Sequence, residues 1–452
     1  MTDAPATIAD ASASRSKGSL LEKDARTKKR NAAETRFKAY GIIAIGIGLA
    51  FLAALVFSIV RNGVPAFTQT YVTVPITLEA ETLDPEGNRD PADISGVMTF
   101  AYSPLIQQGL QSALEEADVE TDMSASDLTK MLSSSAENTV RQRVVSNPDL
   151  IGETEEFRLL ASSRVDGYLK GRVERADLER DRNLDAAHLD IVDQLQEAGV
   201  VSRTFNMDFI LGTDASDNRP EQAGIGASML GSFFMMLVVL ALALPIGVAA
   251  SIYLEEFAPK NKFTDLIEVN ISNLAAVPSI VFGILGLAAF IQFAGLPQSA
   301  PLVGGLVLTL MTLPTIIIST RASLKSVPPS IRDAALGVGA SPMQAVFHHV
   351  LPLAAPGILT GTIIGLAQAL GETAPLLLIG MVGFIASNYP EGVASGFLDP
   401  NSAMPAQIYE WAKRADPAFY ERAWGGIIIL LVFLLSMNLL AIILRRRFER
   451  RW

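Results

Sequence analysis

The 452-residue sequence contains no cysteine, few charged residues and only three histidines, His188, His348 and His349. Without cysteine it can form neither a disulfide framework nor a cysteine-based zinc site, and three histidines alone do not make a metal-ligand set. The sequence also lacks a Gly-x-x-x-x-Gly-Lys-Ser/Thr segment, so it does not hydrolyse ATP through a P-loop. These absences argue against an enzyme and against a metal ion or cofactor bound by this chain.

Half of the residues are hydrophobic and only 18% are charged, a balance that is unusual for a soluble protein. The charge is also unevenly placed. Residues 62–225 hold 30 acidic and 13 basic residues, whereas the rest of the chain holds 17 acidic and 23 basic residues. The sequence therefore predicts a soluble acidic module inserted in a membrane protein with basic flanks. Nothing in this distribution indicates nucleic-acid binding.

Long uncharged runs predict six membrane-spanning helices, because about 20 apolar residues cross the hydrocarbon layer. The run at 269–320 is long enough for two helices, and Gly295-Leu296-Pro297 near its middle predicts the turn between them. The six expected spans are residues 40–60, residues 222–254, two helices within 269–320, Pro352 to Ile385, and Gly425 to Leu444. Lys and Arg gather before the first span, between the second and third, after the fourth and after the last. By the positive-inside rule both termini are cytoplasmic, and the acidic module lies outside.

The acidic module is expected to be α+β. Strands are predicted at Tyr71 to Glu79 and Val201 to Gly212, and helices at Pro104–Ala117, Ala125–Ser133 and about Glu153 to Ala198. No catalytic motif stands out in it.

A polar segment interrupts the apolar half of the chain at residues 328–352. Pro329 can begin a helix and Gly339 can end it in a left-handed conformation. Ser341-Pro342 then supplies a second N-cap, followed by proline at the first helical position. The segment therefore predicts a short helix-turn-helix whose small residues let another surface approach closely.

Glu372 is the most informative single residue, because an ionisable side chain expected midway along an apolar span marks a pathway or a partnered charge. Gly371 and Pro375 flank it and are expected to weaken the helix and free backbone groups beside the carboxylate. The alternative is a carboxylate that is paired only for structure.

Several of these segments resemble a known family. Asp333-Ala334-Ala335, Gly339 and Leu351-Pro352 resemble the "EAA" coupling loop of ABC importer permeases, with Asp in place of Glu. Gly371-Glu372-Thr373-Ala374-Pro375 resembles the signature of phosphate ABC transporter permeases of the PstA type. Further matching stretches are Tyr253 to Asn261, Asn273 to Gly283, Met404 to Ala412 and Arg447 to Trp452.

The resemblance covers about 220–452 and implies a type I ABC importer permease, an all-α polytopic protein of the bacterial cytoplasmic membrane that translocates inorganic phosphate. The implied partners are a homologous second permease, two ATPase subunits that bind ATP and Mg, and a periplasmic phosphate-binding protein. The resemblance implies ATPase coupling by Arg332, Asp333, Ala334, Ala335 and Gly339, and a substrate pathway that includes Ser279, Gln368, Glu372 and Thr373. The expected domains are a basic tail (1–39), a first span (40–61), the outer domain (62–221) and a permease core (222–452) with its coupling loop (321–350).

One departure from the family concerns position 368, where family members commonly carry Arg and this chain has Gln368. A phosphate dianion needs cationic or N–H donors, so either the partner permease supplies the cation or the external binding protein selects the substrate. Two other functions stay open. The chain could import another oxyanion such as molybdate or sulfate, or it could be a membrane receptor that signals from its outer domain, although a receptor has no need of a coupling loop.

Overall fold

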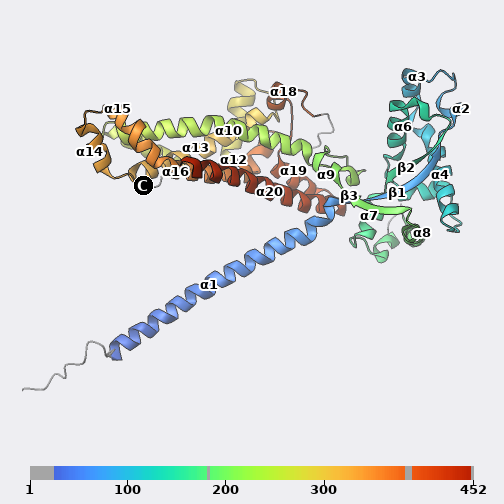
Figure 1. Cartoon of the computed structure of the whole chain (residues 1–452), viewed down its shortest axis with the longest axis horizontal. Helices are drawn as coiled ribbons and strands as arrows, with labels where there is room; N and C mark the ends of the chain where they lie inside the picture. The colour runs from blue at the N-terminus through green and yellow to red at the C-terminus, as the bar shows by residue number, and fades with distance from the viewer. Residues whose placement is uncertain (1–24, 181–183, 382–388, 449–452) are drawn as a thin grey trace, which may run out of the picture. The chain divides into compact units, whose positions relative to one another are not determined.

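The computed structural model describes residues 25–180, 184–381 and 389–448, and the chain divides into two compact units, Met1–Ser58 and Ile59–Trp452. The first unit consists, where it is described, of most of helix α1 (Ala25–Gly63). The second unit contains the sheet-bearing module and the helical core (Figure 1). Because residues 1–24 and 449–452 lie outside the description, most of the expected basic tail and the final Arg450-Arg451-Trp452 are not placed.

The module between α1 and the helical core is α+β, as predicted. Its sheet has the order β2-β1-β3, and both pairings are antiparallel. The strands are β1 (Thr68–Thr77), β2 (Thr154–Leu160) and β3 (Val201–Phe205). The longer helices are α4 (Ser103–Glu116), α6 (Ala136–Ser146) and α8 (Ala186–Glu197), and the short ones are α2 (Ala80–Leu83), α3 (Pro91–Gly96), α5 (Ala125–Leu128), α7 (Ser163–Leu169) and α9 (Met207–Leu211).

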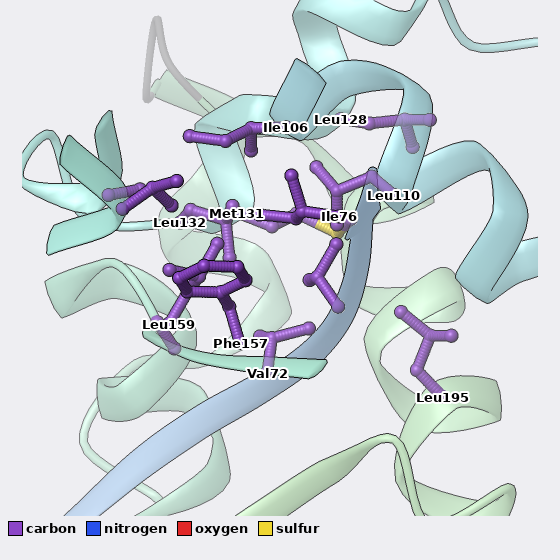
Figure 2. Packing of buried hydrophobic residues seen from close by; sticks show 14 of the residues in the cluster. Val72, Ile76, Ile106, Leu110, Leu128, Met131, Leu132, Phe157, Leu159 and Leu195 are labelled. Atoms are coloured by element: carbon purple, nitrogen blue, oxygen red, sulfur yellow. The ribbon is translucent and has the colours of Figure 1, made fainter. Parts of the chain in front are cut away.

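A hydrophobic core holds this module together. Alternate residues of β1, among them Val72 and Ile76, point to one face of the strand and are buried. Figure 2 shows them packed with Leu110 of α4 and with Phe157 and Leu159 of β2. The module thus has its own core, separate from that of the helical region.

Two sequence predictions in the module were wrong. The stretch from Glu153 to Ala198 is not one helical region, because β2 occupies its start. Phe157 and Leu159 alternate with charged neighbours in the two-residue period of a strand, and glutamate and arginine there suggested a helix instead. The strand predicted from Val201 to Gly212 ends at Phe205, where Asn206 accepts a hydrogen bond from Phe209 N and caps α9.

Within the described residues the chain has five helices long and apolar enough to cross a membrane, including α1, or six if one bent pair is a single span. The core helices are α10 (Gly226–Ile252), α11 (Lys262–Ala275), α12 (Ser279–Gly286), α13 (Pro301–Lys325), α16 (Leu351–Gly371) and α20 (Pro417–Phe448). Figure 1 shows α10, α13, α16 and α20 side by side. A side chain at Gly305 of α13 would meet the backbone of Met235, so glycine permits close packing against α10.

The third and fifth spans differ from expectation. The third is the bent pair, in which α11 and the segment Ser279–Phe293 meet at 100°. Pro278 at this break disfavours helical geometry at the preceding residue. The fifth helix ends at Gly371 and does not continue to Ile385, although residues 382–388 lie outside the described part. The predicted turn near Gly295 is confirmed, since this glycine has a φ of 68°.

Candidate functional site

The polar segment folds as the sequence predicts. Helix α14 (Pro329–Gly337) is followed by Gly339 with a φ of 89°, and α15 (Pro342–Ala345) begins after Ser341. Ser341 and Gln344 form a capping box, in which the Ser341 hydroxyl accepts from Gln344 N and the Gln344 side chain accepts from Ser341 N. These local contacts fix the turn between the two short helices.

The outer surface of this turn is open. Asp333, Ala334 and Gly339 are exposed, whereas Ala335 is buried. A side chain at Gly339 would meet nothing within 4 Å in the chain. Four large apolar side chains are also exposed on this segment, namely Leu336, Val338, Met343 and Phe347. Apolar side chains gathered on a projecting loop indicate a surface that another protein covers.

Arg332 is engaged within the chain. Its guanidinium donates to the Glu256 carboxylate, with distances of 3.0 Å from Nε to Oε2 and 2.5 Å from Nη2 to Oε1. It also donates to the backbone carbonyls of Leu324 and Val327. Hydrogen bonding to Glu256 raises the pKa of Arg332 above its usual value, so the side chain stays charged. The sequence did not indicate this pairing, because the two residues are 76 positions apart.

The predicted pathway residues lie around two helix breaks, one before α12 and one between α16 and the short helix α17 (Ala374–Leu378). Helix α16 ends at Gly371, and α17 begins after Glu372 and Thr373. A side chain at Gly283 of α12 would contact Pro375, and one at Gly286 would approach Ile379. Helices α12 and α17 therefore run parallel and in contact.

This packing brings the start of α12 level with the break between α16 and α17. Ser279 begins α12 just after its break, and Glu372 and Thr373 form the break before α17. Gln368 lies one turn before Glu372 on α16 and is exposed. The fifth span is thus interrupted at Glu372, as Gly371 and Pro375 predicted, but the carboxylate stands at the end of a helix and not midway along one.

The Glu372 carboxylate is partly exposed, and in the described part of the chain it has no hydrogen-bond or ion-pair partner. Ile364, Gln368 and Glu372 are spaced at four-residue intervals, which places them on one face of the helix. Ile364 is 59% exposed and Gln368 is exposed as well. This face is therefore turned away from the chain's own helical core.

Charged residues that sequence analysis missed join the outer module to α20. The Lys170 Nζ atom lies 2.9 Å from Glu421 Oε1 and 2.7 Å from Asp166 Oδ2, so it forms an ion pair with both carboxylates. All three side chains are almost fully buried. Arg172 contacts both carboxylates. The neighbouring Arg422 is also buried and donates to the carbonyls of Ala66 and Glu221 and to the side chain of Gln69.

We expect Glu421→Gln to destabilise this junction strongly. The substitution leaves two cations, Lys170 and Arg172, with Asp166 as their one acidic partner, and breaking a buried ion pair costs about 3–5 kcal/mol. The comparison variant is Glu155→Gln, which removes an exposed pair with Arg143 worth at most about 1 kcal/mol. Proteolysis of the outer module across a urea series measures both effects. Equal urea midpoints for the two variants would contradict the assignment.

No group of three or more potential metal ligands occurs among the residues that the structure describes. A polar cavity of about 330 Å³ lies beside the junction, lined among others by Asn206, Asp214 and Glu221. Asp214 accepts from Trp411 and Arg414, and burial raises the pKa of Glu221. The Asp214 carboxylate thus joins the outer module to the core, whereas the Glu221 carboxylate accepts from the Ser133 hydroxyl of the module itself.

Two different families match the N-terminal part of the chain and the helical core. Residues 230–452 match the family described as the binding-protein-dependent transport system inner membrane component. Residues 24–179 match a domain of unknown function, DUF3333. The coupling-loop and pathway residues all lie in the first of these matches.

Curated relatives match about half of this chain and about three quarters of their own length. The probable ABC transporter permease protein YqgI of Bacillus subtilis is 31% identical over 226 residues, covering 48% of this chain and 76% of that protein. The phosphate transport system permease protein PstA of Mycobacterium leprae is 31% identical over 235 residues, covering 51% and 74%. PstA of Xylella fastidiosa (strain Temecula1) is 29% identical over 229 residues, covering 50% and 77%.

Solved structures that match are ABC transporters. A chain of the MetNI methionine transporter in an inward-facing conformation has a TM-score of 0.38 at 16% identity, covering 50% of this chain and 95% of that one. A chain of a transporter involved in alginate import has a TM-score of 0.36 at 13% identity, covering 50% and 79%.

Proposed function

The chain belongs to the inner-membrane permeases of binding-protein-dependent ABC importers, of the PstA type, and from this premise we propose that it carries inorganic phosphate into the cell. As a member of this family it is a multi-pass inner-membrane subunit and not itself an enzyme. The substrate, the partners and the orientation in the membrane are parts of this proposal. Two curated relatives at about 30% identity are named as phosphate permeases, which supports phosphate over molybdate or sulfate.

The observation that carries the proposal is the projecting turn at Gly339. Its backbone is fixed by a capping box, its surface is open, and exposed apolar side chains surround it. A receptor that only signals has no use for such a surface. We infer that ATPase subunits, which bind ATP and Mg, grip Asp333, Ala334 and Gly339, while Ala335 seats the turn on the core.

The substrate pathway in this proposal runs along Ser279, Gln368, Glu372 and Thr373. The face that carries Gln368 and Glu372 has no cover from its own core, so a homologous second permease closes it. The N-terminus of α12 at Ser279 offers backbone N–H groups, which favour an anion. Glu372 repels phosphate, so its role is to hold a cation of the second permease in position. A periplasmic phosphate-binding protein delivers the substrate.

We expect both termini to be cytoplasmic and the outer module to be periplasmic. Ser126 in the module and Ser330 on α14 are both exposed, and the chain has no cysteine of its own. In intact cells an impermeant thiol reagent should label Ser126→Cys and leave Ser330→Cys unlabelled until the cells are lysed. The reverse pattern would overturn the orientation.

Uptake in cells tests the substrate. A strain that lacks this chain should lose high-affinity uptake of radiolabelled phosphate and regain it when the chain is restored. A hundredfold excess of sulfate or molybdate should leave the restored uptake unchanged. Full competition by either oxyanion would reassign the substrate while leaving the family membership intact.

A further inference from the structure

The pairing of Arg332 with Glu256 lies where α10 and α13 of the core end. Glu256 belongs to the π-helical turn η7 (Tyr253–Phe257) that follows α10, and Arg332 belongs to α14 of the coupling loop. The Leu324 and Val327 carbonyls that accept from Arg332 lie at the end of α13 and just after it. One guanidinium therefore ties together the ends of α10 and α13 and the coupling loop.

Burial distinguishes this contact from the Lys325–Glu255 ion pair nearby. The Glu256 side chain is 8% exposed and that of Arg332 is 23% exposed. Lys325 reaches Glu255 at only 3.6 Å and is 60% exposed. Because exposed pairs are screened and contribute little, the Glu256–Arg332 contact resists displacement better than the Lys325–Glu255 pair.

The neighbouring acid connects a further helix to the same place. Successive residues of a helical turn point about 100° apart, so Glu255 and Glu256 face different partners. Glu255 pairs with Arg321 of α13, and Arg321 in turn donates to Glu268 of α11 at 2.6 Å. Helix α11 leads directly to the break at Pro278 and to Ser279 of the pathway. The stretch from Tyr253 to Asn261, which resembles the family in sequence, thus holds both Glu255 and Glu256.

We propose that Glu256 and Arg332 are positioning residues that make α14 and the ends of α10 and α13 move as one body. This inference rests on the proposed function in one respect, that an ATPase grips the coupling loop. A displacement of α14 then carries α10 and α13 with it, and Arg321 passes the movement to α11 and the pathway. Arg332 thus contributes to ATPase coupling through its contacts with the core.

A double-mutant cycle on the assembled complex tests this link. In reconstituted vesicles Arg332→Gln and Glu256→Gln should each lower phosphate uptake about tenfold at matched complex content, while ATP hydrolysis stays within about twofold of wild type. The double variant should lose no more than either single variant, because both remove the same contact. The control Lys325→Gln, an exposed residue of the same region, should stay within twofold.

Losses that multiply to a hundredfold in the double variant would show that the two residues act independently and would overturn the proposal. Uptake and ATP hydrolysis that fall in parallel would also overturn it, since they indicate a purely structural contact. Normal uptake in both single variants would do the same.

A second measurement does not depend on the substrate. Spin labels at Ser330→Cys on α14 and Lys260→Cys after η7 occupy exposed positions on either side of the link. The distance distribution should be equally narrow with and without ATP in the wild-type complex, and should broaden in Arg332→Gln. Failure of the wild-type complex to import phosphate would refute the proposed function alone. An unchanged distribution in Arg332→Gln would refute the link alone.

Discussion

Gly339→Asp is expected to abolish phosphate uptake while leaving the chain inserted and folded. A Cβ added at Gly339 would meet no atom within 4 Å apart from its chain neighbours, so the new side chain starts in open space. The left-handed φ of 89° adds strain of about 1–2 kcal/mol, which a folded protein can bear. The large effect arises outside the chain, because a charged side chain then stands on the surface that an ATPase must approach closely. Uptake by whole cells and the amount of chain in membranes measure the two parts.

Gly152→Asp is a matched control for this prediction. Gly152 in the outer module also has a left-handed backbone, with a φ of 97°, and open space around its Cα. The substitution therefore carries the same strain and adds the same charge, far from the coupling loop in the sequence. We expect uptake within twofold of wild type. Equal losses at Gly339 and Gly152 would trace the effect to backbone strain and contradict ATPase docking.

Glu372→Gln is expected to reduce phosphate uptake at least about tenfold, equivalent to about 1.4 kcal/mol on the rate-limiting step. The side chain keeps its shape and hydrogen-bonding reach but loses its charge. Because Glu372 has no partner in the described part of its own chain, the loss falls on a group of the second permease that the carboxylate holds. Assembly should stay near normal, since the helix break depends on Gly371 and Pro375. Radiolabelled uptake at matched complex content is the measurement.

Glu391→Gln makes the same chemical change on an exposed stretch outside the helical core. It should leave uptake unchanged. Uptake by Glu372→Gln within twofold of wild type would return this carboxylate to a structural role. A loss of assembled complex in step with the loss of uptake would point the same way.

The sequence predicted best what local chemistry decides. Pro329, Gly339 and Ser341 each determine the backbone conformation at their own position, so the helix-turn-helix of the coupling loop followed from them. Gly371 and Pro375 likewise predicted the break beside Glu372. Strand β2 was missed because Phe157 and Leu159 alternate among residues that favour helices.

Contacts between distant residues could not be foreseen. Lys170 and Glu421 are 251 positions apart, and either alone resembles an ordinary surface charge. Arg332 pairs with Glu256, which is 76 positions away in a turn with no pairing signal of its own. The parallel packing of α12 and α17, which brings Ser279 near the Glu372 break, depends on Gly283 and Gly286, which meet Pro375 and Ile379 only in the folded chain.

ATP-driven phosphate accumulation by the reconstituted complex tests the central claim most directly. Vesicles that contain this chain, its second permease and the ATPase subunits should accumulate radiolabelled phosphate only when ATP and the phosphate-binding protein are both present. Gly339→Asp vesicles should accumulate none. Accumulation that persists in the Gly339→Asp vesicles, or wild-type vesicles that hydrolyse ATP without accumulating phosphate, would contradict the account.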